Sequence, residues 1–177
     1  SCVTSVATKF IVDLYGHKDK YDYVILNTGE VVIVDFNQPK DKREHLIKIG
    51  YEQTKEYFDY ILPKKKQTLY NHYEMILKHL CTLEKELKKR KISQMREEMG
   101  LLFIDLHEAN KVIDENIFDK LTDLKDVFFE HLSEPNIFGM YPKSKLLVVE
   151  TALTIAKNEI LLKKDELRKY ISDKIFV

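Results

Sequence analysis

The chain has 177 residues, enough for one domain with a sizeable core or for two small ones. Basic and acidic residues number 29 each, so the net charge is zero and gives no general attraction to nucleic acid. Apolar residues make up 44% and charged residues 33%, which excludes a disordered chain and a membrane-embedded one.

The spacing of the five glycines excludes several catalytic motifs. They lie at positions 16, 29, 50, 100 and 139, whereas G-x-S-x-G, G-x-G-x-x-G and the P-loop need glycines within a few residues of one another. Cys2 and Cys81 match neither a disulfide framework nor a zinc pattern, and no histidine has a metal-ligand partner at the right spacing. We therefore expect no catalytic residue, no metal and no cofactor in this chain.

The first third of the chain mixes helix and strand signals. Apolar residues at helical spacing predict a helix that Gly16 ends. Two short apolar runs at 23–26 and 31–34 then favour strands, either as a hairpin or as pieces of a larger sheet. A further helix is predicted from Pro39 to about Ile61, with Pro63 as its stop.

After Pro63 the pattern is helical throughout. Apolar stripes predict helices over about 66–90, 93–113 and 116–132 and a long one from about 144. Residues 133–143 hold two prolines and Gly139 and are predicted to form a loop. The stripes are wide, which is typical of an antiparallel bundle. The net charge is +6 over residues 63–91 and −7 over residues 92–142, which favours packing of an acidic segment beside a basic helix.

The stretch from Tyr21 to Phe58 carries a resemblance to a known family. It reads YDYVILNTGEV, then Val34-Asp35-Phe36, then LIKIGYEQT at 46–54. These blocks resemble the end of a patatin-like phospholipase domain, and in particular the VipD-type phospholipase effectors that Legionella injects into host cells. The resemblance covers roughly the first third of the chain, and none of its motifs is catalytic.

The resemblance implies a non-catalytic role for this chain within a phospholipase. Patatin-like enzymes use a Ser–Asp dyad and a glycine-rich oxyanion loop, which would lie upstream, so whether this chain takes part in an enzyme stays open. In VipD-type proteins the helical region after the lipase domain binds an endosomal small GTPase of the Rab type, which activates the lipase. The resemblance thus implies secretion into a host cell, and a location at its endosomal membrane or in its cytosol.

Two groups of residues after Pro63 are candidate binding sites. The first is the apolar loop segment Ile137, Phe138, Met140 and Tyr141, which either folds over the end of the bundle or is offered to a partner. The second is a pair of basic clusters, which either bind anionic lipid headgroups or solvate the ends of a helix: Lys64, Lys65 and Lys66, and Lys88, Lys89, Arg90 and Lys91.

The sequence thus predicts a mainly α protein in two parts. Residues 1–62 would be the end of an α/β patatin-like domain, with a helix, two short strands and a helix. Residues 63–177 would be an antiparallel helical bundle with a regulatory and targeting role, binding a host GTPase and coupling it to the lipase. The alternative is a lipid-binding bundle that anchors the phospholipase to anionic host membranes.

Overall fold

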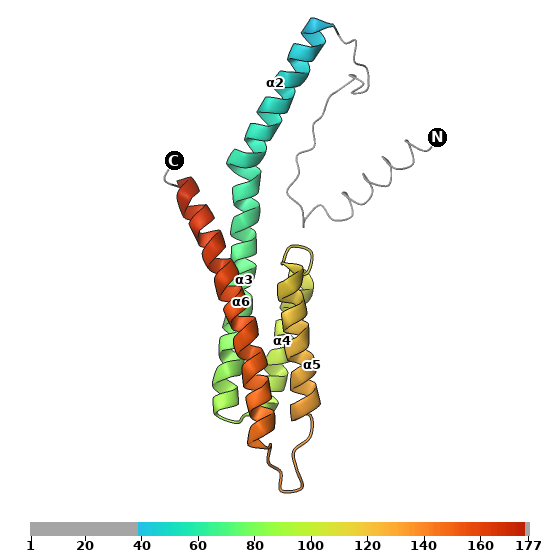
Figure 1. The fold of residues 1–177 in the computed structure, drawn as a ribbon, viewed down its shortest axis with the longest axis vertical. Helices are drawn as coiled ribbons and strands as arrows, with labels where there is room; N and C mark the ends of the chain where they lie inside the picture. Colours follow the sequence, from blue (N-terminus) through green and yellow to red (C-terminus); the bar gives the residue numbers. More distant parts are fainter. Residues whose placement is uncertain (1–38, 176–177) are drawn as a thin grey trace, which may run out of the picture. The chain divides into compact units, whose positions relative to one another are not determined.

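The computed structural model describes residues 39–175, and every regular element in that range is helical. The elements, shown in Figure 1, are α2 (Lys40–Glu56), the π-helical η1 (Tyr57–Ile61), α3 (Leu62–Lys88), α4 (Ile92–Ala109), α5 (Glu115–Leu132) and α6 (Lys143–Ile175). The mainly α prediction is therefore confirmed. The first predicted helix and the two predicted strands lie outside the described residues.

The chain divides into two compact units between Lys66 and Gln67. In the first unit the prediction that Pro63 ends a helix is wrong, because α2 continues through η1 into α3. The amide of Leu62 donates to the carbonyl of Tyr57, five residues earlier, which is the wider π-helical spacing. A proline ring in an α-helix clashes with the carbonyl four residues before it. The π-helical turn before Pro63 widens the backbone there and lets the helix continue.

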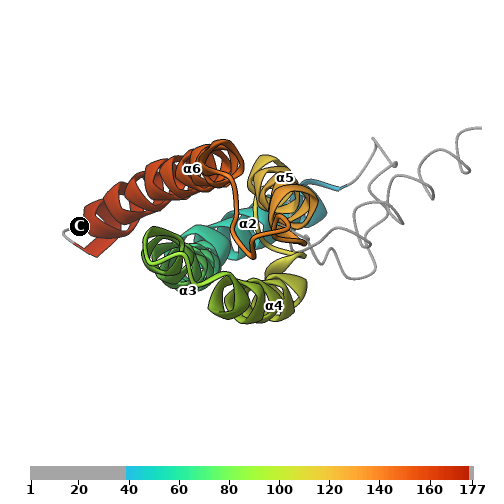
Figure 2. The same cartoon turned by 90° about the horizontal axis from the view of Figure 1, so that it is seen from below.

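The second unit is a bundle of four antiparallel helices, as predicted. Seen from the end in Figure 2, α3, α4, α5 and α6 surround a common centre. The predicted helices are all present, although α4 ends at Ala109 rather than near residue 113. Ile113 is nevertheless buried, because the short connection to α5 folds it onto the core.

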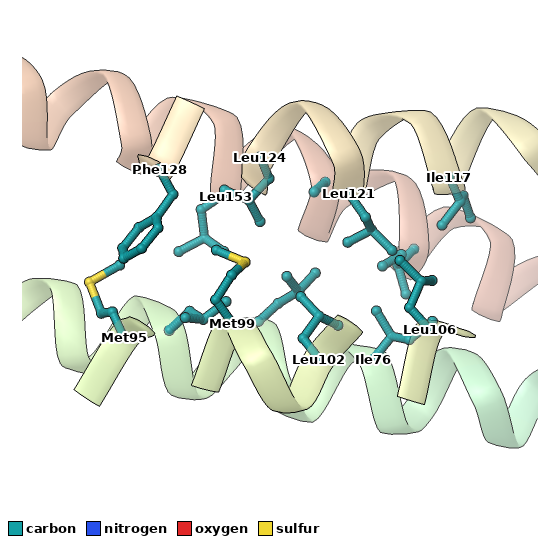
Figure 3. Packing of buried hydrophobic residues seen from close by; sticks show 14 of the residues in the cluster. Ile76, Met95, Met99, Leu102, Leu106, Ile117, Leu121, Leu124, Phe128 and Leu153 are labelled. Atoms are coloured by element: carbon teal, nitrogen blue, oxygen red, sulfur yellow. The ribbon is translucent and has the colours of Figure 1, made fainter. Parts of the chain in front are cut away.

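The core of the bundle is formed by the predicted apolar stripes. Its most deeply buried side chains come from all four helices: Tyr73, Ile76, Leu80, Leu83, Met95, Met99, Leu102, Leu106, Ile117, Leu121, Leu124, Phe128, Val149, Leu153, Ala156 and Ile160. In Figure 3, Met95 on α4 points its sulfur toward the ring of Phe128 on α5. Burial of each valine, leucine, isoleucine, methionine or phenylalanine in this set stabilises the bundle by roughly 1.5–3 kcal/mol.

The connection from α4 to α5 is tied down by hydrogen bonds. The carboxylate of Asp114 accepts from the amide of Asn116 at 2.9 Å and so caps the start of α5. The amide of Asp114 donates to the hydroxyl of Tyr73 on α3 at 3.2 Å. Burial raises the pKa of Tyr73, and the bond from the Asp114 amide, which favours the phenolate, offsets this rise only in part.

Candidate functional site

The loop between α5 and α6 is held in one conformation by the side chain of Asn136. Its Oδ1 accepts from the backbone amides of Phe138 at 3.0 Å and Met140 at 2.9 Å. The backbone of Asn136 donates to Met140 and accepts from Gly139, each at 2.8 Å. Gly139 has a φ of 71°, which a residue without a Cβ adopts at no steric cost. The loop is therefore a closed, hydrogen-bonded turn.

This turn exposes large apolar side chains to solvent. Ile137 is 93% exposed, Phe138 75% and Met140 60%. The fourth predicted residue, Tyr141, is half-buried and packs against the core of the bundle. Three of the four predicted residues are therefore exposed to solvent, while Tyr141 packs against the core and attaches the loop to the bundle.

The second basic cluster lies at the same end of the bundle as this loop. Lys88, Lys89, Arg90 and Lys91 are exposed in the turn from α3 to α4, and Figure 1 shows both connections at the lower end of the bundle. The guanidinium of Arg96, in the first turns of α4, donates to the carbonyl of Ser133 at the end of α5, at 3.3 Å. We call this end, residues 85–96 and 130–145, the loop end.

Two ion pairs join α6 to α3, and their positions show that the two helices are antiparallel, with the start of α6 at the loop end. Lys157 contacts Glu84 at 2.6 Å, and Lys164 contacts Glu74 at 3.4 Å. The later residue of α6 thus pairs with the earlier residue of α3, so the two helices run antiparallel. Continuing this register brings the first turn of α6, with Lys143 and Lys145, past the end of α3.

The charge of the loop end is strongly positive. It holds eight basic and three acidic side chains, a net charge of +5. At the other end, residues 105–119 comprise the end of α4, the connection and the start of α5; they hold one basic and five acidic side chains, a net charge of −4. The neutral chain therefore carries a basic surface around its exposed apolar loop.

The two predicted basic clusters fall in different compact units. Lys64, Lys65 and Lys66 lie in the first turns of α3 and belong to the first unit, whereas Lys88–Lys91 belong to the second unit, together with the apolar loop.

A histidine pairs with two carboxylates across the α3–α4 interface. Nδ1 of His79 lies 2.6 Å from Oε1 of Glu98, and Nε2 lies 2.7 Å from Oδ2 of Asp105. Burial of the imidazole opposes its protonation, but the hydrogen bonds to Asp105 and Glu98 outweigh burial and raise the pKa of His79. This ion triad is a polar contact between the acidic α4 and the basic α3, beside the buried core that the two helices share.

The sequence interpretation missed this triad, although the hairpin carries a signal for it. With the turn centred on Arg90, an antiparallel partner of His79 falls near residue 101, midway between Glu98 and Asp105. The two carboxylates lie seven residues apart and so share one face of α4. They occupy opposite sides of the imidazole and do not converge on a common point. Within residues 39–175, no group of three or more histidine, cysteine, aspartate or glutamate side chains is placed to hold a metal ion.

No helix among the described residues is long and apolar enough to cross a membrane. The comparisons with known proteins found no family model, no curated protein and no solved structure that matches the chain.

Proposed function

We propose that the bundle of residues 67–175 is a non-catalytic docking and targeting module that attaches the protein to its site of action through the loop end. The observation that carries this proposal is the turn closed by Asn136, which leaves Ile137 and Phe138 largely exposed to water. A loop that only covered the end of the bundle would bury these side chains, as it does Tyr141.

The energetic cost of the exposed loop supports a binding role. Keeping an isoleucine, a phenylalanine and a methionine in water forgoes roughly 1.5–3 kcal/mol for each side chain that burial would otherwise supply. Aromatic residues and methionine are enriched in the buried centres of interfaces. The fixed turn also lowers the entropic cost of binding, because the loop needs little further ordering.

The resemblance of residues 21–58 to patatin-like phospholipases extends the proposal to the parent protein. In this extension the parent is a phospholipase A secreted into a host cell, and the bundle regulates and targets it at an endosomal membrane. A Rab-type small GTPase is the protein partner that the VipD-type resemblance supplies. This extension rests on the resemblance alone, whereas the docking role of the loop end rests on its geometry.

The test compares capture by the full chain and by two matched triple variants. The loop variant is I137S/F138S/M140S, and the control is L101S/I104S/L162S, which replaces three similarly exposed apolar residues on the outer faces of α4 and α6. Each immobilised protein is incubated with host-cell homogenate loaded with a GTP analogue or with GDP. Bound proteins are then identified by mass spectrometry and bound phospholipid by phosphate assay.

The proposal predicts that the loop variant loses the bound material and that the control variant keeps it. A GTP-dependent small GTPase among the proteins that the loop variant loses would support the extension. Capture of the same material by the loop variant and the natural sequence would contradict a docking role for the loop end.

A further inference from the structure

We infer that the loop end docks on an anionic phospholipid bilayer, with the apolar turn entering the headgroup region and the α3–α4 turn binding lipid phosphates. This inference rests on the proposed docking function and names its partner. It follows from the combination of an exposed apolar turn and a basic cluster at one end of the bundle.

The shape of the loop end suits a membrane surface. The exposed apolar side chains Ile137, Phe138 and Met140 are consecutive apart from Gly139, and a turn stabilised by internal hydrogen bonds presents them. Because Asn136 satisfies the amides of Phe138 and Met140, the turn can reach the boundary between headgroups and acyl chains without carrying those two donors unpaired. A turn that docked on a protein would need this internal pairing less, because a protein partner can supply acceptors for the amides of Phe138 and Met140.

The charges around the turn select the lipid class. Lys88, Lys89, Arg90 and Lys91 are all exposed, and the amide of Arg90 bonds back to Leu87 at 2.9 Å in a left-handed turn with φ 55°. Reversal of the chain at Arg90 therefore gathers the cluster into one turn. Each basic residue near an anionic membrane strengthens binding about 5-fold. The net charge of +5 at the loop end and of −4 over residues 105–119 at the opposite end also orients the bundle with its loop toward such a surface.

Two signals together are needed for stable attachment. A few apolar side chains bind a membrane weakly and reversibly, and a basic patch adds the second contribution. Neither the turn nor the lysine cluster suffices alone, which distinguishes this surface from a purely electrostatic patch. Both contributions should therefore be measurable separately by substitution.

The experiment is flotation of the full chain with vesicles of phosphatidylcholine alone or with added phosphatidylserine. The apolar variant is I137S/F138S/M140S and its control is L101S/I104S/L162S. The basic variant is K88Q/K89Q/K91Q. Its control is K111Q/K120Q/K169Q, which removes the same charge from the α4–α5 half of the bundle and from the later turns of α6.

The inference predicts flotation with phosphatidylserine vesicles and little with phosphatidylcholine. The apolar variant should bind about 100-fold more weakly and the basic variant also about 100-fold, while both controls keep the affinity of the natural sequence. Raising the salt from about 0.05 M to about 0.5 M should weaken binding of the natural sequence sharply and binding of the basic variant far less.

Equal binding to neutral and anionic vesicles would overturn the inference, as would controls that lose affinity as much as the loop-end variants. Absence of flotation with every vesicle would also overturn it. If loop-dependent capture from homogenate persists in that case, the proposed docking function stands with a protein as partner. If that capture is absent as well, both fail.

Discussion

The Nε2 atom of His79 on α3 lies 2.7 Å from the Oδ2 atom of Asp105 on α4. The other ring nitrogen faces the carboxylate of Glu98 at 2.6 Å. Both nitrogens can donate only when the ring is protonated, so the imidazolium form fastens α3 to α4. A neutral ring would point a lone pair at one of the two carboxylates.

The bundle should therefore lose stability as the pH rises. The pKa of His79 is raised in the folded state, because its hydrogen bonds to two carboxylates outweigh burial. Its stabilising contribution is complete below the unfolded pKa of about 6.5 and is lost as the pH rises through the folded value. We expect the urea midpoint to be lower near pH 9 than near pH 6.

The variant H79Q should flatten this pH dependence, because glutamine does not titrate. H107Q replaces an exposed histidine on α4 and serves as the control that keeps it. A natural sequence whose urea midpoint is the same at both pH values would show that the triad contributes no net stability.

Neighbouring phenylalanines on α5 should differ sharply in their effect on stability. Phe128 is fully buried, whereas Phe129 is 43% exposed. F128A leaves a cavity in the core and should lower the free energy of unfolding by about 3–5 kcal/mol. F129A removes a partly exposed ring that contacts the edge or face of Phe128 at 5.2 Å between centroids, and should lower it by about 1–2 kcal/mol. Thermal unfolding of the two variants measures the difference, and similar values would contradict the placement of Phe128 in the core.

The ion pair between Glu84 on α3 and Lys157 on α6 should contribute little stability and should weaken in acid. Glu84 accepts from Lys157 at 2.6 Å and from Lys88 at 3.0 Å, and these two bonds lower its pKa, the Lys157 bond first. Stability from a carboxylate with a lowered pKa is present above its unfolded value and lost as the pH falls through the folded value. A double-mutant cycle with E84Q and K157M should give a coupling of about 0.5–1 kcal/mol near pH 7.

The same cycle repeated near pH 3 should give a smaller coupling, since that pH lies below the unfolded pKa of about 4.3 and the stabilisation is lost as the pH falls from there toward the lowered folded pKa of Glu84. The exposed pair Lys163 and Glu166 within α6 is the comparison, with an expected coupling below about 0.5 kcal/mol. A coupling between Glu84 and Lys157 that did not weaken in acid would rule out a charge-dependent contact.

Most of the bundle could be predicted from the sequence, because apolar residues recur at helical spacing in segments longer than two turns. Leu121, Leu124 and Phe128 are buried as their spacing on α5 requires. The prediction that a helix ends at Pro63 is wrong, because a π-helical turn before the proline relieves the clash on which that prediction depends.

The candidate site could be predicted only in part. The apolar loop residues were visible in the sequence, but whether the loop is buried or exposed depends on the four hydrogen bonds that Asn136 makes with Phe138, Gly139 and Met140. The loop and Lys88–Lys91 lie at the same end of the bundle because the four helices are antiparallel in chain order. The two features lie 45 or more residues apart in the sequence, so no local pattern indicates that they share one end of the bundle.

Asn136 should control the order of the loop without controlling the fold. N136A removes the acceptor for the amides of Phe138 and Met140. Hydrogen exchange at these two amides should speed up, while exchange in the buried turns of α4 and α5 stays unchanged. N136D keeps an acceptor and should retain the protection. Equal exchange at Phe138 in N136A and the natural sequence would contradict the pinning role of this side chain.

The most direct test of membrane docking uses the absence of tryptophan from the chain. F138W places a single tryptophan in the turn, and I104W places one on the exposed face of α4 as the control. Adding phosphatidylserine vesicles should shift the fluorescence of F138W to shorter wavelength, because the ring enters the headgroup region, and should leave I104W unchanged. No shift for F138W, or an equal shift for both variants, would contradict docking of the loop end on an anionic membrane.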